Sequence, residues 1–251
     1  MPSVPALSVV VPLKDEASNV AAVVEEVAAV LGPALPDYEL ILVDDGSTDG
    51  TFEHVRTLHA ADPTHVVGLR FSRNFGQSAA FTAGFAAAGA PLVATMDGDL
   101  QNDPADLPRL MALAASHDIV SGWRKRRQDA VLTRHVPSVI ANALIGAVTG
   151  VRLHDNGCSL KVYRAEVVKP LHLRPGMHRY LPAIASQLGG RVTEVVVNHR
   201  PRRFGTSKYG LSRTFRVVAD LVHLHRLMRE ALVPRPAGAP LYEIAERLDS
   251  R

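Results

Sequence analysis

The sequence predicts an α/β fold in which helices cover both faces of a mainly parallel central sheet. Between residues 7 and 122, short apolar runs alternate five times with segments of helical periodicity, and the links between them are short. The runs are nearly continuous in apolar residues, which is typical of strands that are buried on both faces. Hydrophobic residues make up 47% and charged residues 21% of the 251 positions, an ordinary composition for a packed core.

The apolar runs indicate five strands in the first half of the chain. The first run, LSVVVP, is closed by a proline, and the second, YELILV, is followed directly by two aspartates. Each run has the length and composition of a buried strand. In chain order, we expect these strands at Leu7–Pro12, Tyr38–Val43, Val66–Phe71, Leu92–Met96 and Ile119–Gly122.

Helices are expected between these strands. The first is indicated by apolar residues at helical spacing, with Ser18 and Asn19 as candidate caps and Gly32-Pro33 as the stop signal. The last, Asp103–Ser116, opens with an Asp-Pro pair that is typical of an N-cap and first turn. The two helices between them are expected at Thr51–Ala60 and within Gln77–Ala88.

After Arg124 the alternation of strands and helices weakens. In this part we expect two helices and two strands, at Val136–Thr149, Leu211–Leu232, Ser159–Tyr163 and Val192–His199. The composition becomes loop-like from Pro234 to Pro240, and we interpret the last residues as a loosely attached helix. The chain is therefore divided into a main domain, residues 1–232, and a C-terminal extension, residues 233–251.

The cysteine content and the hydropathy limit the cellular setting. A single cysteine excludes an intramolecular disulfide and fits a reducing compartment. The N-terminus lacks the features of a secretory signal. The two longest uncharged stretches, Gln77–Met96 and Val136–Val151, do not meet the requirement of about 20 predominantly apolar residues for a membrane span. Any membrane contact is therefore expected to be peripheral.

Acidic side chains gather where a sheet of this kind places its ligand, at the carboxyl ends of the strands. Asp15 and Glu16 follow the first expected strand, Asp44–Asp49 follows the second, and Asp97-Gly98-Asp99 follows the fourth. Asp, Gly and Ser also favour turns and helix caps, which is the alternative interpretation of any one of these loops. For three such loops together we favour a shared ligand site.

The spacing of Asp97 and Asp99 suits a divalent cation. On a strand that bends into a loop, both carboxylates reach one cation, and such oxygen ligands favour Mg²⁺ or Mn²⁺, with phosphate oxygens completing the shell. Gln101 adds a carbonyl oxygen or a hydrogen bond. Of Asp44 and Asp45, one is expected to accept hydrogen bonds from a nucleoside and the other to stay near the metal.

Several other functions are disfavoured. The chain contains no G-x-x-x-x-G-K-[ST], no G-x-G-x-x-G after the first strand, and no G-x-S-x-G or H-E-x-x-H. These absences argue against P-loop enzymes, dinucleotide-binding oxidoreductases and the commonest hydrolases. The net charge of +3 and the scarcity of aromatic residues disfavour nucleic acid as a partner. Basic residues cluster in segments 124–134 and 200–216, either as solvated faces or as contacts for anions.

The motifs at the strand ends resemble those of the family 2 inverting glycosyltransferases, which have the GT-A fold with a Rossmann-like sheet. The motifs are V-P-L-K-D-E at 11–16, V-D-D-G-S-T-D at 43–49 and D-G-D-L-Q at 97–101, in the expected order. Within that family the chain is similar to dolichyl-phosphate mannose synthases and bacterial polyprenyl-phosphate glycosyltransferases, from about Leu7 to about Leu232.

The resemblance implies a donor-binding role for residues in these motifs. The residues that would hold the nucleotide are Pro12, Glu16, Asp44 and Asp45. The residues that would organise the metal and the donor diphosphate are Asp97, Asp99 and Gln101. Arg200–Tyr209, with Arg202 and Lys208, resembles a loop that closes over the diphosphate, and Asn156–Lys161 resembles a segment that lines the sugar site.

The resemblance also implies contacts with the acceptor. Arg124, in the segment Gly122-Trp123-Arg124, matches an arginine that meets an acceptor phosphate, and Arg134 with Ser138 matches a further pair of this kind. Two departures bear on function. Leu13-Lys14-Asp15 replaces the more usual Thr-Tyr-Asn type of segment, which leaves the base contacts there open. The Q-x-x-R-W motif of processive polysaccharide synthases is absent, which predicts transfer of a single sugar.

A lipid-linked phosphate suits these residues as the acceptor. A phosphate is largely ionised at neutral pH, because its second pKa is about 6, and it therefore needs no strong general base. Arg124, Arg134 and Lys208, with one metal ion, would offset the repulsion between this phosphate and the donor diphosphate. We predict inverting transfer of one hexose from GDP-mannose or a UDP-sugar to a polyprenyl or dolichyl phosphate, in the cytoplasm at the inner face of a membrane.

Two other functions stay open at this point. In one, the chain transfers sugar to a hydroxyl group of a polysaccharide or a small molecule, and an Asp or Glu serves as the base. In the other, it is a noncatalytic scaffold that binds nucleotide or an anionic surface. The sequence also leaves open the donor, the oligomeric state and the need for a membrane-protein partner.

Overall fold

The computed structural model describes residues 4–125, 142–143, 145–147, 149–201 and 241–249. The helix expected at Leu211–Leu232 and the loop-like stretch Pro234–Pro240 lie outside these residues, as does most of the helix expected at Val136–Thr149. The division between residues 232 and 233 falls in the same undescribed part, and it stays a prediction.

An eight-stranded sheet forms the centre of the fold, in the order β7-β5-β6-β4-β1-β2-β3-β8. The strands are β1 (Leu7–Leu13), β2 (Tyr38–Asp44), β3 (Val66–Phe71), β4 (Leu92–Thr95), β5 (Ile119–Trp123), β6 (Lys161–Arg164), β7 (Val192–Val196) and β8 (Ile244–Leu248). Strands β6 and β8 run antiparallel to their neighbours, and the other pairs are parallel. The predicted α/β class with a mainly parallel sheet is confirmed.

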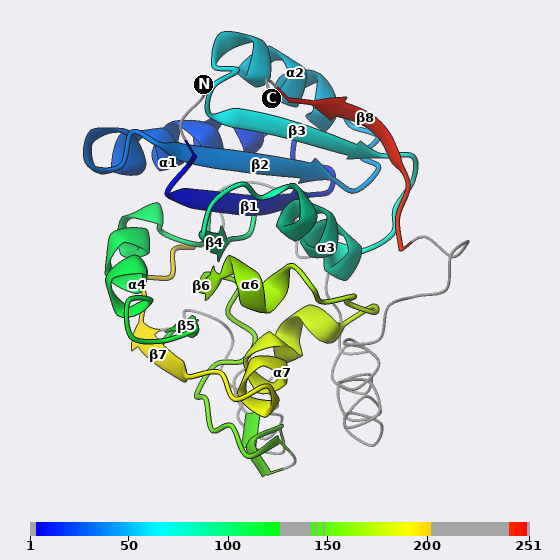
Figure 1. Ribbon diagram of the computed structural model, residues 1–251. Coiled ribbons are helices and arrows are strands. Elements are labelled where there is room, and N and C mark those ends of the chain that lie inside the picture. The colour runs from blue at the N-terminus through cyan, green and yellow to red at the C-terminus, as the bar shows by residue number, and fades with distance from the viewer. Residues whose placement is uncertain (1–3, 126–141, 144, 148, 202–240, 250–251) are drawn as a thin grey trace.

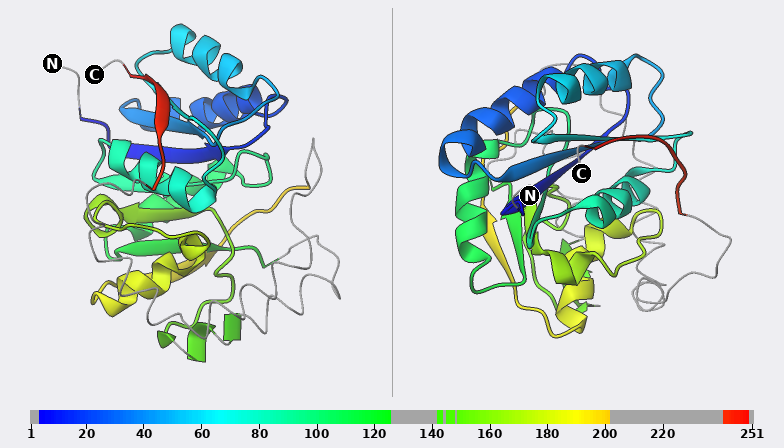
Figure 2. Two further views of the ribbon diagram at one scale, coloured as in Figure 1. Left: turned by 90° about the vertical axis from the view of Figure 1, so that its right-hand side faces the viewer. Right: turned by 45° about the horizontal axis from the view of Figure 1, so that its top comes forward.

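Helices cover both faces of this sheet (Figures 1 and 2). On one face lie α1 (Val20–Ala34), α2 (Thr51–Ala61), the short 3₁₀ helix η1 (Pro104–Asp106) and α4 (Leu107–Leu113). On the other face lie α3 (Gln77–Ala87), α6 (Ala165–Val168), the 3₁₀ helix η3 (Met177–Tyr180) and α7 (Leu181–Gln187). The Asp103 carboxylate accepts a hydrogen bond from the Ala105 N–H at 3.0 Å, which confirms the N-cap expected there.

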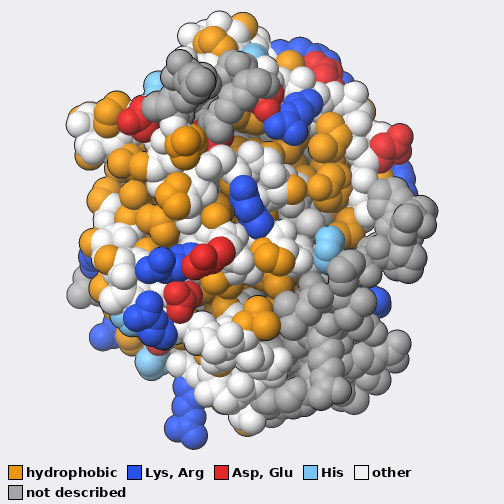
Figure 3. All heavy atoms as spheres, viewed as in Figure 1, with side chains coloured by type: hydrophobic (Ala, Val, Ile, Leu, Met, Phe, Trp, Pro, Cys, Tyr) orange, Lys and Arg blue, Asp and Glu red, His pale blue; other side chains and the backbone are white. Residues whose placement is uncertain are grey.

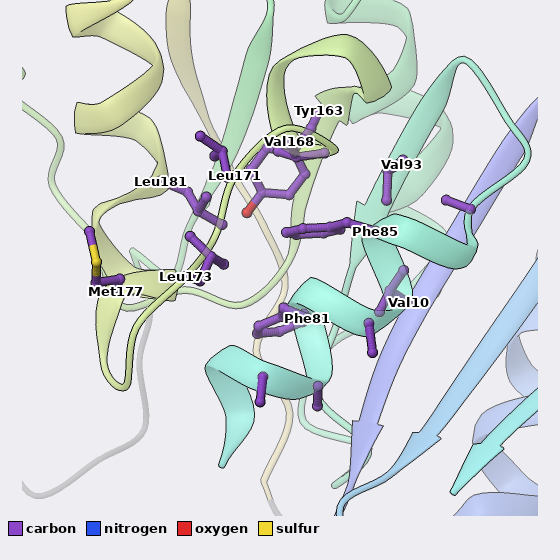
Figure 4. Close-up of a cluster of buried hydrophobic side chains, with 14 of the residues drawn as sticks. Val10, Phe81, Phe85, Val93, Tyr163, Val168, Leu171, Leu173, Met177 and Leu181 are labelled. Atoms are coloured by element: carbon purple, nitrogen blue, oxygen red, sulfur yellow. The ribbon is translucent and has the colours of Figure 1, made fainter. Parts of the chain in front are cut away.

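Successive side chains of β1 point to opposite faces of the sheet and therefore pack in two separate hydrophobic clusters. Val9 and Val11 pack with the cluster under α1, whereas Val10 packs with the cluster under α3. Figure 4 shows this second cluster, in which Phe81 and Phe85 of α3 lie between Val10 and the side chains of Val168 and Leu171. Both faces of the central strands are therefore buried, as their continuous apolar runs indicate.

The structure confirms the expected ends of α1 only in part. Helix α1 does not stop at Gly32-Pro33 but continues to Ala34, because the fixed φ of proline is compatible with the last turn and the Leu35 N–H still donates to the Leu31 carbonyl at 2.7 Å. Asn19 occupies the N-cap position, yet its side chain makes no capping hydrogen bond.

The expected C-terminal helix is wrong, because Ile244–Leu248 forms strand β8 at the edge of the sheet. Two hydrogen bonds, 2.9 and 2.6 Å long, join the Arg56 guanidinium to the Glu246 carboxylate, and the Tyr242 ring stacks on Phe71 at a centroid distance of 5.1 Å. Backbone pairing with the otherwise unpaired edge of β3 thus outweighs the helical propensity of Glu, Ala, Arg and Leu in this segment.

The surface of the described residues mixes charge signs. In the face shown in Figure 3, several Lys and Arg side chains lie next to Asp and Glu side chains. Large apolar side chains that are exposed in the described part of the chain are Val4, Leu188, Val196 and Ile244. No helix within these residues combines the length and the hydrophobicity needed to cross a bilayer.

Candidate functional site

The three acidic loops meet at the point where the strand order reverses. Strand β1 lies between β2 and β4, so the loops that follow these three strands leave the sheet at one edge. The Asp45 N–H donates to the Leu13 carbonyl at 2.8 Å, which ties the second loop to the first. The third loop also lies against the end of β1, because a Cβ atom at Gly98 would be 2.6 Å from Cδ2 of Leu13 and 3.4 Å from the Pro12 carbonyl oxygen.

Further hydrogen bonds connect the first two loops. The Asp15 N–H donates to the Ser47 hydroxyl at 2.8 Å, and the Asp15 carboxylate accepts from the Thr48 N–H at 2.9 Å. Asp15 has a φ of 50°, which is uncommon for a residue with a side chain. The Glu16 N–H donates to the Thr51 hydroxyl at 2.9 Å, just beyond that second loop, and the Glu16 carboxylate accepts from the Asn19 amide within its own loop at 2.6 Å. These contacts hold Asp15 and Glu16 beside the loop that follows β2.

Asp44 is fully buried at the end of β2. One carboxylate oxygen accepts from the Ser47 N–H at 3.1 Å, while the other lies 3.9 Å from Nε of Arg70 and makes no hydrogen bond. Burial raises the pKa of Asp44, and this effect outweighs the hydrogen bonds from Ser47 and the charge of Arg70, which lower it. Asp44 is therefore a buried carboxylate with one oxygen that has no hydrogen-bond partner among the described residues.

Asp45 organises the loop between β3 and α3. Its carboxylate accepts from the Phe75 N–H at 2.6 Å, from the Gly76 N–H at 2.9 Å and from the Asn74 amide at 3.1 Å. Burial raises the pKa of this carboxyl group, although the hydrogen bonds from Phe75 and Gly76 lower it. Asp45 therefore stabilises the loop that leads into α3, a role that the sequence did not indicate. Its predicted contact with the nucleotide stays a prediction.

Asp97 receives one side-chain hydrogen bond on each carboxylate oxygen. The Gln77 amide donates to Oδ1 at 3.0 Å, and the Ser159 hydroxyl donates to Oδ2 at 2.7 Å. The backbone N–H of Asp97 donates to Oδ1 of Asn102 at 2.8 Å. The orientation of this carboxylate is thus set by residues from α3, from the loop before β6 and from its own loop.

Asp99 lies two residues further on, in a strained turn. Its carboxylate accepts from the Gln101 N–H at 3.2 Å, and Leu100 between them is buried with a φ of 62°. A left-handed leucine is costly, and such strain is maintained only by the surrounding structure. Here the Arg200 N–H donates to the Gln101 carbonyl at 2.9 Å, so a segment distant in sequence stabilises the end of this turn.

A divalent cation fits the chemistry of Asp97 and Asp99. Within the part of the chain that the structure describes, no three His, Cys, Asp or Glu residues gather as a metal site. Two carboxylates are nevertheless sufficient for Mg²⁺, which is commonly bound by one or two carboxylates together with substrate phosphates. The Gln101 amide donates to the Arg200 carbonyl at 3.4 Å, so its predicted ligand role stays a prediction.

Arg124 is joined to Asp155 in a buried pair. Its Nε lies 2.7 Å from one carboxylate oxygen and its Nη2 lies 3.0 Å from the other, and the two side chains are 9% and 7% exposed. Asp155 was not among the predicted site residues, since an ion pair between distant segments has no local signal. The predicted contact of Arg124 with an acceptor phosphate stays a prediction.

The loop from Asp155 to Lys161 carries a second buried cation. The Lys161 amine donates to the carbonyls of Asn156 and Cys158, and burial lowers its pKa. Cys158 is itself buried, beneath Gly122 of β5. Lys161 therefore stabilises the loop internally, while the Arg124–Asp155 pair joins the loop to the end of β5.

The remaining predicted residues divide into two groups. Pro12 is paired with Val43 in the register of β1 and β2, beside the acidic loops. Four residues with predicted roles lie outside the part of the chain that the structure describes: Arg134, Ser138, Arg202 and Lys208. Gln77 and Asn102 are site residues that the sequence did not indicate, and Ser159 was expected only as part of the segment Asn156–Lys161 beside the sugar. Gln77 and Ser159 reach Asp97 through the tertiary fold, whereas Asn102 belongs to the same loop as Asp97.

Comparison with known proteins places these observations in a family. The model of the family described as "Glycosyl transferase family 2" matches residues 8–171. The chain is 46% identical over 227 residues to the dodecaprenyl-phosphate galacturonate synthase of Rhizobium johnstonii, an alignment that covers 89% of this chain and 67% of that protein. It is 37% identical over 217 residues to an undecaprenyl-phosphate 4-deoxy-4-formamido-L-arabinose transferase of Aeromonas hydrophila, with 86% and 66% covered. The chain thus spans about two thirds of the length of these relatives.

Solved structures agree on the fold. Mannosyl-3-phosphoglycerate synthase from Rubrobacter xylanophilus superposes with a TM-score of 0.69 at 16% identity, covering 98% of this chain and 87% of that one. Glucosyl-3-phosphoglycerate synthase from Mycobacterium tuberculosis, solved with Mn²⁺, uridine diphosphate and phosphoglyceric acid, gives 0.67 at 18% identity, covering 93% and 81%. At these identities the likeness concerns the fold alone, and it confirms the GT-A architecture.

Proposed function

Because this chain belongs to glycosyl transferase family 2, we propose that it transfers one glycosyl group from a nucleotide-sugar to the phosphate of a polyprenyl phosphate. The observation that carries the proposal is the meeting of three acidic loops at the switch point of the sheet. The names of the two relatives described above support the acceptor, since both refer to a polyprenyl phosphate.

The donor nucleotide would lie across the ends of β1 and β2. Asp44 has a carboxylate oxygen without a hydrogen bond, and a nucleoside N–H or O–H would satisfy it. Pro12 and Glu16 would line the same side. Asp45 would contribute indirectly, by holding the loop that precedes α3.

Asp97 and Asp99 would hold a divalent cation, Mg²⁺ or Mn²⁺, together with the oxygens of the donor diphosphate. When bound, such a cation stabilises the negative charge of a leaving nucleoside diphosphate. The contribution of the chain itself is to keep the two carboxylates in place, through the hydrogen bonds to Asp97 and through the strained turn at Leu100.

The acceptor phosphate would be met by cationic side chains from the second half of the chain. We assign Arg124, Arg134 and Lys208 to this task, with Ser138 as a hydrogen-bond donor. Arginine suits it because its planar guanidinium pairs with phosphate oxygens. In Arg124, Nε and one N–H of Nη2 donate to Asp155, so the phosphate would take N–H groups that this pair does not use. Attack from the face opposite the leaving group would invert the anomeric carbon, and ionised phosphate needs no general base for this step.

The relatives are named for galacturonate and for 4-deoxy-4-formamido-L-arabinose, which widens the range beyond mannose, glucose and N-acetylglucosamine. A dolichyl-phosphate mannose synthase activity is one member of this range. We further propose that the chain acts peripherally at the inner face of a membrane, where a lipid phosphate is accessible, with or without a membrane-protein partner.

A donor panel tests the proposal directly. The purified chain is incubated with undecaprenyl phosphate in detergent, Mg²⁺ or Mn²⁺, and one labelled donor at a time: nucleoside-diphosphate galacturonate, GDP-mannose, UDP-glucose or UDP-N-acetylglucosamine. We expect label in the lipid extract for one donor, and none when undecaprenol replaces the phosphate or when EDTA is added. Label transferred only to a hydroxyl acceptor would contradict the proposed acceptor.

The metal role is tested separately with Asp99→Ala. We expect a fall in transfer rate of about 100-fold or more, because a cation at a developing phosphate charge contributes several kcal/mol. Asp62→Ala is the matched control, since Asp62 is on the surface and pairs with His65. An unchanged rate for Asp99→Ala would end the assignment of this residue to the metal.

A further inference from the structure

Both oxygens of Asp97 are engaged by neutral donors that come from distant parts of the chain. Gln77 precedes Asp97 by 20 residues and opens helix α3. Ser159 follows it by 62 residues and precedes strand β6. Two separate elements thus converge on one carboxylate.

The Gln77 side chain is held in position by its helix. The start of α3 is fixed by Asp45, which accepts hydrogen bonds from the Phe75 and Gly76 N–H groups immediately before Gln77. Further along, α3 lies so close to β1 that a Cβ atom at Gly84 would be 2.2 Å from Cγ1 of Val10. The amide of Gln77 is therefore presented to Asp97 by a helix anchored at both ends.

Ser159 is held equally firmly from the other side. The Thr95 hydroxyl, at the end of β4, donates to the Ser159 carbonyl at 2.6 Å. Asn102 accepts from the Asp97 N–H at 2.8 Å, and its Oδ1 lies 2.9 Å from the Ser159 hydroxyl. A hydroxyl has one hydrogen, and a carboxylate is the stronger acceptor, so we assign the hydrogen to Asp97.

The neutrality of these donors has a chemical consequence. A carboxylate accepts about four hydrogen bonds or metal contacts, so one donor on each oxygen leaves both oxygens able to coordinate. A Lys or Arg hydrogen-bonded to either oxygen would offset the charge that attracts a cation, whereas an amide and a hydroxyl orient the carboxylate without adding charge. The cations that act on Asp97 electrostatically, Arg124 and Lys161, make no hydrogen bond to its carboxylate among the described contacts. Partners of this kind orient metal ligands, and their loss typically weakens metal affinity by about 10–100-fold.

We propose that Gln77 and Ser159 are positioning residues that orient Asp97 for the divalent cation bound with the donor diphosphate, and that Asp45 acts on the same carboxylate through Gln77. This inference rests on the proposed function, because it requires the cation at Asp97 and Asp99. It adds two residues outside the acidic motifs to the machinery of the site, with roles that differ from direct contact with substrate.

The test measures metal binding rather than turnover. Mn²⁺ affinity is determined by electron paramagnetic resonance, in the presence of UDP and separately of GDP, for Gln77→Met and Ser159→Ala. The first keeps the length of the side chain without its donor, and the second removes only the hydroxyl. Gln187→Met and Ser116→Ala are matched controls, because Gln187 and Ser116 are exposed, at the end of α7 and just after α4 respectively.

We expect Mn²⁺ affinity to fall about 10–100-fold in each positioning variant, and to stay unchanged in the controls. Ser159→Thr, which retains a hydroxyl, should bind Mn²⁺ better than Ser159→Ala. Thermal melting without metal shows whether each variant is folded. Unchanged affinity in both positioning variants, with normal binding by the unsubstituted chain, would overturn the positioning role alone. Failure of the unsubstituted chain to bind Mn²⁺ with either nucleotide would overturn the metal role and this inference together.

Discussion

The guanidinium of Arg124 spans both carboxylate oxygens of Asp155, with N–O distances of 2.7 and 3.0 Å. The backbone N–H of Arg124 also donates to Asp155, at 3.3 Å. This buried pair joins the end of β5 to the loop that leads through Ser159 to β6, and Ser159 in turn holds Asp97. A residue predicted to face the acceptor thus also anchors the loop that supports the proposed metal site.

Removing one partner of this pair should be strongly destabilising. We expect Asp155→Ala to lower the free energy of unfolding by about 3–5 kcal/mol, because it leaves a buried guanidinium without its counter-charge. Chemical denaturation measures the loss. Glu53→Ala serves as the control, since the pair of Glu53 with Arg56 is exposed and should matter little. Equal effects of the two substitutions would contradict the description of Arg124–Asp155 as a buried pair.

The buried carboxylate of Asp44 should produce a pH-dependent stability. Burial raises its pKa in the folded chain, so the ionised form is disfavoured relative to the unfolded chain. This penalty is absent below the unfolded pKa of about 4 and complete once the pH exceeds the raised folded value. We therefore expect the melting temperature of Asp44→Asn, relative to the unsubstituted chain, to increase with pH across that window and then to level off.

Thermal scans without ligand from pH 3.5 to 8 check this expectation. Asp37→Asn is the control, since Asp37 is exposed before β2. A difference in melting temperature between Asp44→Asn and the unsubstituted chain that does not vary with pH would show that Asp44 keeps its ordinary pKa in the folded protein.

The close approach of α3 to β1 should not tolerate a methyl group. Gly84→Ala places its Cβ 2.2 Å from Val10, and we expect a loss of about 1–3 kcal/mol of stability from overpacking. Gly32→Ala in α1 is the matched control, because nothing lies within 4 Å of the added Cβ and alanine favours a helix. Urea unfolding should rank Gly32→Ala above Gly84→Ala in stability, and the reverse order would contradict the packing described.

Strand β8 should protect the edge of the sheet. Deleting residues 242–251 exposes the hydrogen-bonding groups of β3 and removes the Tyr242 ring from Phe71. We expect a lower melting temperature and self-association, because a free edge strand pairs with other chains. Light scattering after size-exclusion chromatography measures the association, with a chain that lacks only residues 250–251 as control. A deletion variant with the same mass and melting temperature would show that β8 does not protect this edge.

Much of the site could be predicted because its main residues follow strands directly. Asp44 ends β2, and Asp97 and Asp99 come just after β4, so their convergence follows from the rule that parallel strands share a carboxyl edge. Their individual surroundings could not be predicted. Asp44 and Asp45 are neighbours in sequence, yet one keeps a carboxylate oxygen without a hydrogen bond and the other holds the start of α3.

Local patterns alone determined the order of strands and helices as far as β5, the acidic loops and the Asp103 cap, because apolar periodicity and turn chemistry act over a few residues. The short helices α6, η3 and α7 were not predicted. Only the tertiary structure decided that Gln77 and Ser159 reach Asp97, that Asp155 pairs with Arg124, and that the C-terminal segment becomes β8. Each of these depends on which strands are neighbours in the sheet. Contacts between distant side chains and pairing at the edge of a sheet are properties of that arrangement, and they leave no local signal in the sequence.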